Sequence, residues 1–463
     1  MKKTSIIILT YNQLDYTKIC LESIKLYTQG DYEIIVVDNA SSDGTAEWLK
    51  GQKEIITIFN TENKGFPAGC NQGILRAEGE VIVLLNNDTI VTPHWLDNLV
   101  ACLESSADIG AAGPATNANS YYQYVDVDYE QFDFQGLVAF AAKNNRSHAG
   151  VRKERLKLTG FCLAVKKEVI AKIGLLDEIF SPGYAEDDDF CVRMIQAGYK
   201  IMFCADSFVH HFGKVSFAEF YKDPAKVQGL FPDIGNGYQK FQQKWGFQPQ
   251  HSDLIRLDTI KLITENDAAK KIRVLEIGCA CGATLLEIKN LFPKAQIYGI
   301  ELNEHSARIA NYFAQVQIGD AEKMEFPYPE NYFDYILCPN ILEHLVDPWK
   351  LLGKLKKYLK PTGHLIASIL NVMHFSVVAE LLSGNWDYRD EGILAKTHLR
   401  FFTLNTMKEM LANSGYSIKE IKNNVSPGSN FKTFLDQLEK LVPPDKKEEL
   451  LIFQYLVKAE PVK

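Results

Sequence analysis

The sequence lacks several features that would place it in a simple class of protein. No stretch approaches the ~18 consecutive apolar residues that cross a bilayer. The apolar run at residues 6–9 is also too short for the hydrophobic region of a secretory signal. CxxC pairs are missing, and an odd total of nine cysteines cannot all form disulfides. We therefore expect a soluble, cytoplasmic protein, and peripheral contact with the inner face of a membrane stays open.

An excess of positive charge is missing as well. The 463 residues include 50 Lys and Arg against 58 Asp and Glu, which gives a net charge of −8. Most of the acidic excess lies before residue 250. Neither half of the chain carries the basic footprint of a general nucleic-acid binder, so no nucleic-acid partner is expected. An acidic first half is typical of a domain whose carboxylates hold metal.

In both halves, apolar β-rich runs alternate with segments that have helical spacing of apolar residues. This rhythm predicts an α/β protein with mainly parallel sheets that are covered by helices. At roughly 100–200 residues per domain, two to four domains are allowed. We expect two, residues 1–250 and 251–463. The expected strands are residues 5–10, 32–37, 54–59, 80–85 and 159–165, then 273–277, 296–301, 332–338 and 364–369.

Three other segments carry more specific expectations. Thr92-Pro93 is typical of an N-cap followed by proline at the first helical position, which predicts a helix through Leu103. Residues 115–157 are polar and aromatic, and a flexible acceptor loop is one interpretation of them. The tail, residues 428–463, suggests two charged amphipathic helices around Pro443-Pro444.

Polar residues follow the predicted strands at the edge where parallel sheets bind ligands. They are Thr10, Asn12, Asp38 and Asp88. Asp38 can accept hydrogen bonds from a uracil or thymine ring or from a ribose, and it can equally cap the loop that follows. Asp88 ends the triplet Asn86-Asn87-Asp88. A carboxylate that faces a diphosphate is repulsive unless a hard cation such as Mg²⁺ or Mn²⁺ lies between them.

Four consecutive acids, residues 186–189, form the second feature of the first half. Adjacent carboxylates repel one another, and one of them can be poised as a general base. The alternative is a solvated helix N-terminus, where acids complement the helix dipole. His210 ends a later strand, and its neutral imidazole could complete a metal shell or serve packing alone.

Taken together and in this order, these segments resemble the family 2 glycosyltransferases, which have the GT-A fold. The resemblance covers about residues 4–215 and is greatest to the rhamnosyltransferase-type branch. The segments that carry it are residues 5–12, 36–41 and 63–71, Asn86-Asn87-Asp88, Gly160-Phe161, residues 186–193 and His210.

The resemblance implies an inverting transfer from a nucleoside diphosphate sugar, with dTDP-rhamnose as our expected donor and a glycan or lipid-linked oligosaccharide as acceptor. Asp187 would deprotonate the acceptor hydroxyl, and Asp88 with His210 would bind Mn²⁺ or Mg²⁺. Asn86 stands where the family commonly has the first acid of Asp-x-Asp, which implies weaker metal binding. The nucleotide-sugar-binding residues would be Thr10, Asn12, Asp38, Asn63, Gly65, Asn87 and Glu186.

The second half contains a glycine-bearing turn between a predicted strand and a helix, residues 274–282. Glycines at such a turn allow close approach of the backbone to a ligand, but the GxGxxG spacing of a dinucleotide site is not met. The segment resembles motif I, Glu-x-Gly-x-Gly-x-Gly, of class I S-adenosylmethionine-dependent methyltransferases, with a Rossmann-like fold. Ala280 replaces the middle glycine. This resemblance covers about residues 255–425.

The second resemblance implies S-adenosylmethionine as cofactor. Glu301 would take the ribose hydroxyls, Asp320 would bond the adenine amino group, and Asn340 would lie beside methionine. The full set of cofactor residues is Glu276, Gly278, Gly282, Glu301, Asp320, Ala321 and Asn340. His344 or His398 could take the hydroxyl proton during methyl transfer, and each could instead be structural. Cys279 and Cys281 are expected to be small buried residues without redox or metal chemistry.

These features predict a bifunctional enzyme that adds a sugar to a growing cell-surface glycan of bacterial type and methylates a sugar hydroxyl. One alternative is an active glycosyltransferase whose methyl domain is a scaffold or acts on an unrelated small molecule. A second alternative is a noncatalytic glycan-binding or assembly module. The intact acid run and the ribose-binding glutamate argue against the second alternative.

Overall fold

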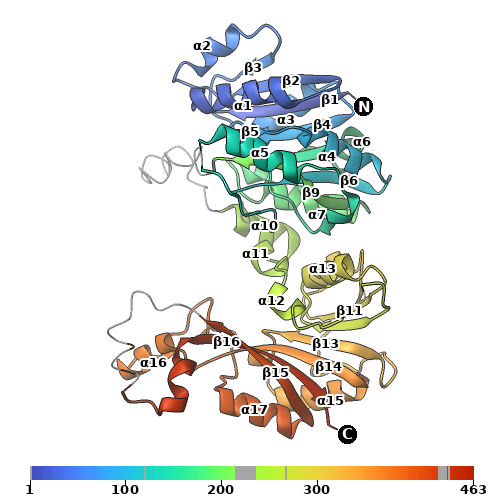
Figure 1. Cartoon of the computed structure of the whole chain (residues 1–463), viewed down its shortest axis with the longest axis vertical. Coiled ribbons are helices and arrows are strands. Elements are labelled where there is room, and N and C mark those ends of the chain that lie inside the picture. The colour runs from blue at the N-terminus through green and yellow to red at the C-terminus, as the bar shows by residue number, and fades with distance from the viewer. Residues whose placement is uncertain are drawn as a thin grey trace. The chain divides into compact units, whose positions relative to one another are not determined.

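The computed structural model describes residues 3–118, 121–130, 132–213, 236–265, 268–425, 435, 438 and 440–462 (Figure 1). The chain forms two compact units, Met1–Asp253 and Leu254–Lys463. No helix within the described ranges is long and apolar enough to cross a membrane.

Strands of the N-terminal unit form one mixed sheet, nine of them within the described residues, in the order β3-β2-β1-β4-β8-β6-β9-β5 with β7 beside β9. Neighbours β3, β2, β1 and β4 run parallel, whereas β8 runs antiparallel to β4 and β6. The strands are β1 (Thr4–Thr10), β2 (Tyr32–Asp38), β3 (Ile56–Phe59), β4 (Val81–Asn86), β5 (Thr89–Val91), β6 (Ile109–Ala115), β7 (Arg152–Arg155), β8 (Cys162–Lys166) and β9 (Lys200–His211).

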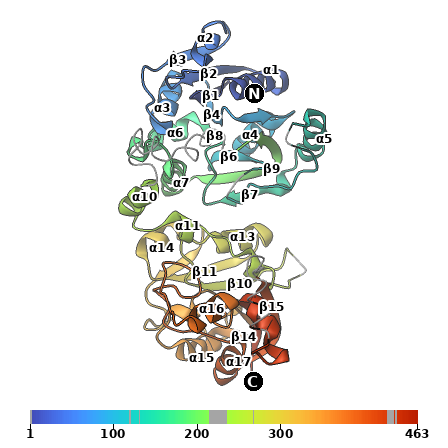
Figure 2. The ribbon, with the colours of Figure 1, turned by 90° about the vertical axis from the view of Figure 1, so that its left-hand side faces the viewer.

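Helices cover both faces of this sheet, as Figure 2 shows for α1 and α3 on either side of β1. Because side chains alternate along a strand, Ile6 and Ile8 pack in the core with α1 and α4, and Ile7 faces α3. The approach of α3 is close: a Cβ added at Gly73 would lie 2.3 Å from Cγ2 of Ile7. The helices are α1 (Leu14–Tyr27), α2 (Thr45–Lys50), α3 (Phe66–Arg76), α4 (Trp95–Glu104), α5 (Phe134–Asn144), α6 (Lys167–Ile173), α7 (Glu186–Gln196), α10 (Gly237–Trp245) and α11 (Pro249–Ser252), with 3-10 turns η1 (Ala149–Val151) and η2 (Glu178–Phe180).

The C-terminal unit is built on a second sheet with strand order β12-β11-β10-β13-β14-β16-β15. Its strands from β12 to β14 are parallel, and β16 runs antiparallel to both β14 and β15. The strands are β10 (Arg273–Ile277), β11 (Gln296–Glu301), β12 (Gln315–Ile318), β13 (Phe333–Pro339), β14 (Leu359–Leu370), β15 (Tyr416–Val425) and β16 (Ile452–Pro461). The helices are α12 (Leu257–Ile260), α13 (Ala283–Leu291), α14 (Glu304–Ala310), α15 (Pro348–Tyr358), α16 (Phe375–Leu382) and α17 (Leu404–Asn413), with 3-10 segments η3 (Leu342–His344) and η4 (Pro444–Leu451).

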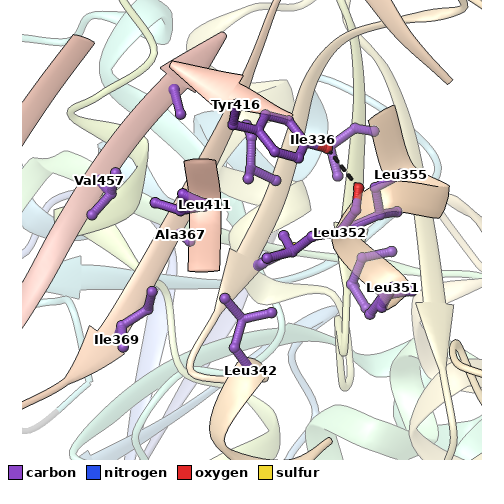
Figure 3. Close-up of a cluster of buried hydrophobic side chains, with 14 of the residues drawn as sticks. Ile336, Leu342, Leu351, Leu352, Leu355, Ala367, Ile369, Leu411, Tyr416 and Val457 are labelled. Atoms are coloured by element: carbon purple, nitrogen blue, oxygen red, sulfur yellow. Dashed lines mark hydrogen bonds between the residues drawn. The ribbon is translucent and has the colours of Figure 1, made fainter. Parts of the chain in front are cut away.

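Two helices, α15 and α17, bury their apolar faces against one side of this sheet (Figure 3). The Tyr416 hydroxyl lies in the same core and donates a hydrogen bond of 2.9 Å to the carbonyl of Leu352, so its polar atom is satisfied. Truncating a core leucine to alanine typically costs about 2–5 kcal/mol. The labelled core side chains are Ile336, Leu342, Leu351, Leu352, Leu355, Ala367, Ile369, Leu411, Tyr416 and Val457.

The α/β fold class is confirmed, but the predicted C-terminal helices are wrong in part. Residues 444–451 form a 3-10 segment, whereas Ile452–Pro461 is the strand β16 between β14 and β15. Tyr455 and Val457 are buried in this strand, since sheet pairing outweighs a weak helical pattern. Residues 428–434, 436–437, 439 and 463 of the predicted tail lie outside the described residues.

The predicted N-cap at Thr92 is also wrong. The Thr92 hydroxyl donates to the carbonyl of Phe208 and accepts from Nδ2 of Asn145 at 2.8 Å, so it ties this turn to β9. The helix begins later, at Trp95, after a left-handed residue, His94, with φ of 64°. The unassigned residues 115–157 contain α5, η1 and β7, and strand β8 begins later than the expected 159–165 segment.

Candidate active sites

Both sheets have a switch point, where consecutive crossovers leave in opposite directions and ligands bind at the strand ends. In the N-terminal unit the switch lies at β1, between β2 and β4. The register sets Thr10 beside Asp38 and Leu9 beside Asn86. The polar residues that follow these strands therefore share one edge of the sheet.

Asp38 is buried at the end of β2, and its two carboxylate oxygens differ. Oδ2 accepts a hydrogen bond of 3.3 Å from the backbone N–H of Ser41, whereas Oδ1 has no hydrogen-bond partner among the described residues. Burial raises the pKa of Asp38. The free oxygen fits the predicted contact with a base or ribose, and the Ser41 bond is the loop cap that the sequence also allowed.

Thr10 and Asn87 are tied to each other in the interior of this edge. Nδ2 of Asn87 donates to Oγ1 of Thr10 at 3.2 Å and to Oγ1 of Thr17 at 3.1 Å. Asn12 follows in the loop after β1, and its Oδ1 accepts a hydrogen bond of 2.8 Å from the N–H of Ser42. These bonds hold the loop after β1 against the loop after β2, and contact of the three predicted residues with a sugar nucleotide stays a prediction.

Asn39 organises the loop that contains Asn63 and Gly65, a role the sequence analysis missed. Its Nδ2 donates to Oδ1 of Asn63 at 2.7 Å and to the carbonyl of Gly65 at 3.2 Å. Gly65 then meets the segment that leads to the acid run, because a Cβ there would lie 2.9 Å from Cα of Pro182. The N–H of Phe66 donates to the carbonyl of Pro182 at 2.8 Å. The signal in the sequence was an Asn directly after Asp38, at the end of an apolar run.

The two consecutive histidines at the end of β9 have different surroundings. His211 lies opposite Thr89, and its Nε2 is 3.2 Å from Oδ1 of the buried Asp88. His210 points to the other face, with Nδ1 2.8 Å from the Tyr129 hydroxyl and Nε2 without a hydrogen-bond partner among the described residues. Burial lowers the pKa of His210 to about 4. The structure thus brings His211, and not the predicted His210, to Asp88.

Gly160 and Phe161 connect this pair with the acid run. The N–H of Gly160 donates to Oδ2 of Asp187 at 3.0 Å. The carbonyl of Phe161 accepts from the N–H of Asn86 at 2.8 Å, and its ring stacks on His211 with centroids 5.2 Å apart. Asp187 and the loop of Asp88 therefore reach the same edge of the sheet.

The acid run is not a solvated helix end, because three of its four residues are buried. Asp188 pairs with Lys157, whose Nζ lies 2.7 Å from Oδ1. Asp189 pairs with Arg193 one turn later at 2.8 Å. Two of the four charges are thus compensated inside the domain.

Glu186 and Asp187 have no cationic partner within hydrogen-bond distance among the described residues. Burial raises the pKa of Asp187 to about 6 and raises that of Glu186 as well. Two left-handed residues, Tyr184 (φ 74°) and Ala185 (φ 71°), turn the chain directly before them. Each such residue costs roughly 1–2 kcal/mol, so the turn that presents these carboxylates is held by its surroundings.

In the C-terminal unit the switch lies at β10, between β11 and β13. The loop after β10 contains three residues with positive φ: Gly278 (72°), Ala280 (49°) and Gly282 (80°). The N–H of Ala280 donates to Oε2 of Glu301 at 2.7 Å, and Oε1 of Glu301 accepts from Asn303 at 2.8 Å. The predicted ribose ligand therefore also fixes the glycine-bearing loop.

Glu276 lies beneath this loop and is buried. Its Oε2 has no hydrogen-bond partner in the described part of the chain, and burial raises its pKa to about 8. Asp320 sits after β12, where it accepts from the N–H of Glu322 at 2.9 Å and pairs with Lys323 at 2.8 Å. Ala321, its neighbour, is partly buried. Contact of Glu276, Asp320 and Ala321 with the cofactor stays a prediction.

Asn340 follows β13 and belongs to a polar network that the sequence did not indicate. Its backbone N–H donates to Oγ of Ser368 at 2.9 Å, and Ser368 returns a bond of 2.7 Å to Oδ1 of Asn340. Nε2 of Gln454 donates to the same Oδ1, and Arg256 donates to Oγ of Ser368 at 3.1 Å. These partners come from distant strands and from the start of the unit, so no local signal marks them.

His344 and His398 are brought together, with ring centroids 4.7 Å apart. Nδ1 of His344 lies 3.2 Å from the carbonyl of Thr397, and Nδ1 of His398 lies 2.8 Å from the carbonyl of Ile393. A carbonyl only accepts, so Nδ1 carries the proton in both rings and the basic lone pair is on Nε2. Burial lowers the pKa of His344, which keeps this base neutral.

The chain is a two-domain α/β protein in which acids and tight turns lie at the switch point of each sheet, the place where such folds bind ligands. Residues 5–148 match the family model of glycosyl transferase family 2, and residues 247–421 match the model of a methyltransferase domain. The chain thus joins a segment that matches family 2 glycosyltransferases to a segment that matches a methyltransferase domain. The expected GT-A-type and class I methyltransferase-type folds are confirmed. Asp187 and both histidines of β9 lie beyond the first match.

Several known proteins resemble the chain. A glycosyltransferase, AglE, of Haloferax volcanii is 25% identical over 60% of this chain and 91% of its own length. The O-antigen chain rhamnosyltransferase RfbN of Salmonella typhimurium is 27% identical over 45% of this chain and 66% of its own length. A mannosyltransferase structure from Pyrobaculum calidifontis, with GDP-mannose and Mn²⁺, has a TM-score of 0.36 at 20% identity and covers 45% and 56% of the two chains. The match to an uncharacterized protein of Sinorhizobium fredii, 29% identical over 42% of this chain, spans only 23% of that relative.

Relief of backbone strain at Ala280 gives the first prediction. Ala280→Gly removes the Cβ from a left-handed position and leaves the N–H bond to Glu301 intact. We expect the methyltransferase unit to become more stable by about 1 kcal/mol, as measured by urea unfolding. Ala379→Gly, in the interior of α16, is the matched control and should lose about 1 kcal/mol, because its backbone is helical. Destabilisation by Ala280→Gly would contradict the strained-loop account.

Proposed function

We propose that the chain is a bifunctional glycan-modifying enzyme. Its N-terminal domain transfers a sugar, with inversion, from a nucleoside diphosphate sugar to a glycan hydroxyl. Its C-terminal domain uses S-adenosylmethionine to methylate a sugar hydroxyl. The observation that carries the proposal is the meeting of Asp38, the Asp88–His211 pair and Asp187 at one sheet edge. The methyltransferase match and the Glu301-bound loop support the second activity.

Asp187 is the proposed base for sugar transfer. It takes the proton of the acceptor hydroxyl while that oxygen bonds to the anomeric carbon and the bond from this carbon to the diphosphate breaks. With a pKa of about 6, its carboxylate is ionised at neutral pH and is a stronger base than an ordinary aspartate. The N–H groups of Gly160 and Asp188, at 3.0 and 2.9 Å, hold the two oxygens in place.

Asp88 and His211 are the side chains proposed to hold Mn²⁺ or Mg²⁺. A buried carboxylate beside an imidazole suits such a cation, which when bound would neutralise charge on the diphosphate. The described residues contain no group of three or more His, Cys, Asp or Glu that could hold a metal. A diphosphate and water would therefore complete the shell.

The proposed donor is dTDP-rhamnose, and the proposed acceptor is a cell-surface glycan or its lipid-linked precursor on the cytoplasmic side of a membrane. Similarity to a named O-antigen chain rhamnosyltransferase supports this choice of sugar and glycan. All nine cysteines are buried and form no disulfide in the described part of the chain, as suits a reducing compartment.

In the second domain, His344 or His398 is the proposed base for methyl transfer. Bound S-adenosylmethionine would supply an activated methyl group, so the protein has to align the acceptor and accept one proton. Nε2 of either histidine is available for that proton because Nδ1 is committed to a backbone carbonyl. Covalent fusion would raise the effective concentration of a product of the first site at the second.

Replacement of the proposed base gives the next prediction. Asp187→Asn keeps the side-chain shape but cannot accept the acceptor proton, so sugar transfer should fall by about 10²–10⁴-fold. The measurement is mass spectrometry of a rhamnose-terminated oligosaccharide incubated with Mn²⁺, a panel of nucleotide sugars and S-adenosylmethionine. Glu168→Gln, an exposed acid on α6, is the control and should retain the sugar increment. An active Asp187→Asn enzyme would refute the assignment of the base.

The two histidines of β9 allow a paired test of the metal site. His211→Ala should weaken Mn²⁺ binding in the presence of dTDP by at least about tenfold, as loss of a ligand or its support does. His210→Ala removes an imidazole that bonds Tyr129 and should change this affinity far less. Electron paramagnetic resonance of free Mn²⁺ measures both. The reverse order of the two effects would restore His210 as the ligand.

Glu301 separates the bifunctional proposal from the scaffold alternative. Glu301→Gln should weaken S-adenosylmethionine binding in calorimetry, because one charged acceptor of the ribose and of the loop N–H is lost. The sugar increment should persist and the methylene increment should disappear. Glu304→Gln, an exposed acid on α14, is the control. Full methylation of the glycan by the Glu301→Gln enzyme would refute the role of Glu301, whereas a sugar increment without a methylene increment from the unchanged enzyme would favour the scaffold alternative.

A further inference from the structure

A buried lysine lies between two carboxylates next to the proposed base. Nζ of Lys157 is 2.7 Å from Oδ1 of Asp188 and 2.8 Å from Oδ2 of Asp253. The three side chains are only 16%, 5% and 10% exposed. Lys157 precedes β8, whereas Asp253 follows α11, so the cluster joins segments almost a hundred residues apart.

The position of the lysine is fixed from a third direction. Its Nζ lies 4.8 Å from the centroid of the Tyr121 ring, which attracts a cation. The Tyr121 hydroxyl donates to the backbone carbonyl of Asp253 at 3.0 Å. A buried charge held in this way acts at a constant distance on its surroundings, with little screening by water.

Two backbone hydrogen bonds relate Lys157 indirectly to the proposed base, Asp187. Through its ion pair it holds Asp188, whose backbone N–H donates to Oδ1 of Asp187 at 2.9 Å. In its own segment, Gly160 follows three residues later, and the N–H of Gly160 donates to Oδ2 of Asp187 at 3.0 Å. Both oxygens of Asp187 thus accept hydrogen bonds from backbone groups close in sequence to Lys157 or to its ion-pair partner Asp188.

We propose that Lys157 is a positioning residue for sugar transfer, whose charge, shared by Asp188 and Asp253, keeps the Asp187 carboxylate ionised and oriented. The inference rests on the proposed role of Asp187 as base. Without the cation, three carboxylates would share one buried space, and the ionised form of Asp187 would be the one destabilised.

The charged groups around Asp187 agree with this role. Burial and the charge of Asp188 raise the pKa of Asp187, and Lys157 lowers it. The titratable neighbours are Glu186, Asp188 and Cys191 on α7, Lys157 before β8 and Tyr238 on α10, while Asp253 after α11 acts on Lys157 and Asp188. Lys157 is the cation that acts on Asp187 in this set.

Two substitutions with opposite expected signs test the proposal. Lys157→Met removes the cation, so the acidic limb of kcat/KM for sugar transfer should move up by about one pH unit. Asp188→Asn removes a like charge and leaves the lysine with Asp253, so the limb should move down. The pKa of Asp187 is read independently of any substrate by ¹³C NMR of aspartate-labelled full-length protein, with Asp187→Asn identifying its signal.

Lys157→Arg is the conservative variant, and its acidic limb of kcat/KM should lie near that of the unchanged protein. Circular dichroism reports whether Lys157→Met folds, and if it does not, Asp188→Asn and Lys157→Arg decide the matter alone. The proposal would be overturned if Lys157→Met and Asp188→Asn lowered kcat equally and moved neither the acidic limb of kcat/KM nor the ¹³C titration of Asp187. A fully active Asp187→Asn enzyme would instead overturn the proposed base, so the two failures are distinguishable.

Discussion

Compensation of buried negative charge is the constraint on which the glycosyltransferase domain depends. Four consecutive acids begin α7, and the domain provides Lys157 and Arg193 for the third and fourth of them. Removing one partner of a buried ion pair typically costs about 3–5 kcal/mol, a large part of the about 5–15 kcal/mol that stabilises a domain. The first two acids have no such partner among the described residues and lie where rearrangement is costly, which suits the proposed base Asp187 and the proposed ligand contact of Glu186.

In both domains the proposed ligand site lies at the same place, the switch point of the sheet. Parallel strands leave their carboxyl ends at one edge, and a switch point opens that edge between two crossovers. In one domain the edge carries Asp38 and Asp88, and in the other it carries the strained loop that Glu301 holds. The chemistry differs because the side chains after the strands differ, while the sheets share the principle.

Local pattern was sufficient for the strands β1 to β4, β8, β10, β11, β13 and β14 and for the residues that follow them, but not for β5, β6, β7, β12, β15 and β16. Asp38, Asp88 and Glu301 could be placed because each ends or follows a clear apolar run. The local sequence does not show which of two consecutive strand residues faces a given side of the sheet. Whether His210 or His211 faces Asp88 depends on the pairing of β9 with β5, which lies over a hundred residues earlier in the chain. The Lys157–Asp253 contact and the strand β16 likewise arise from tertiary packing, which single-sequence periodicity does not contain.

The segment from α10 to Asp253 ends the first unit, and its side chains contact the acids at the start of α7. Trp245 donates to Asp189 at 2.9 Å, and Asp253 holds Lys157. Gly237 lies so close to the backbone of Tyr184 that an added Cβ would be 2.3 Å from its carbonyl oxygen. To express the two domains as separate polypeptides, the chain would therefore have to be divided after Asp253. An earlier division would leave residues that complete the first domain on the polypeptide of the second.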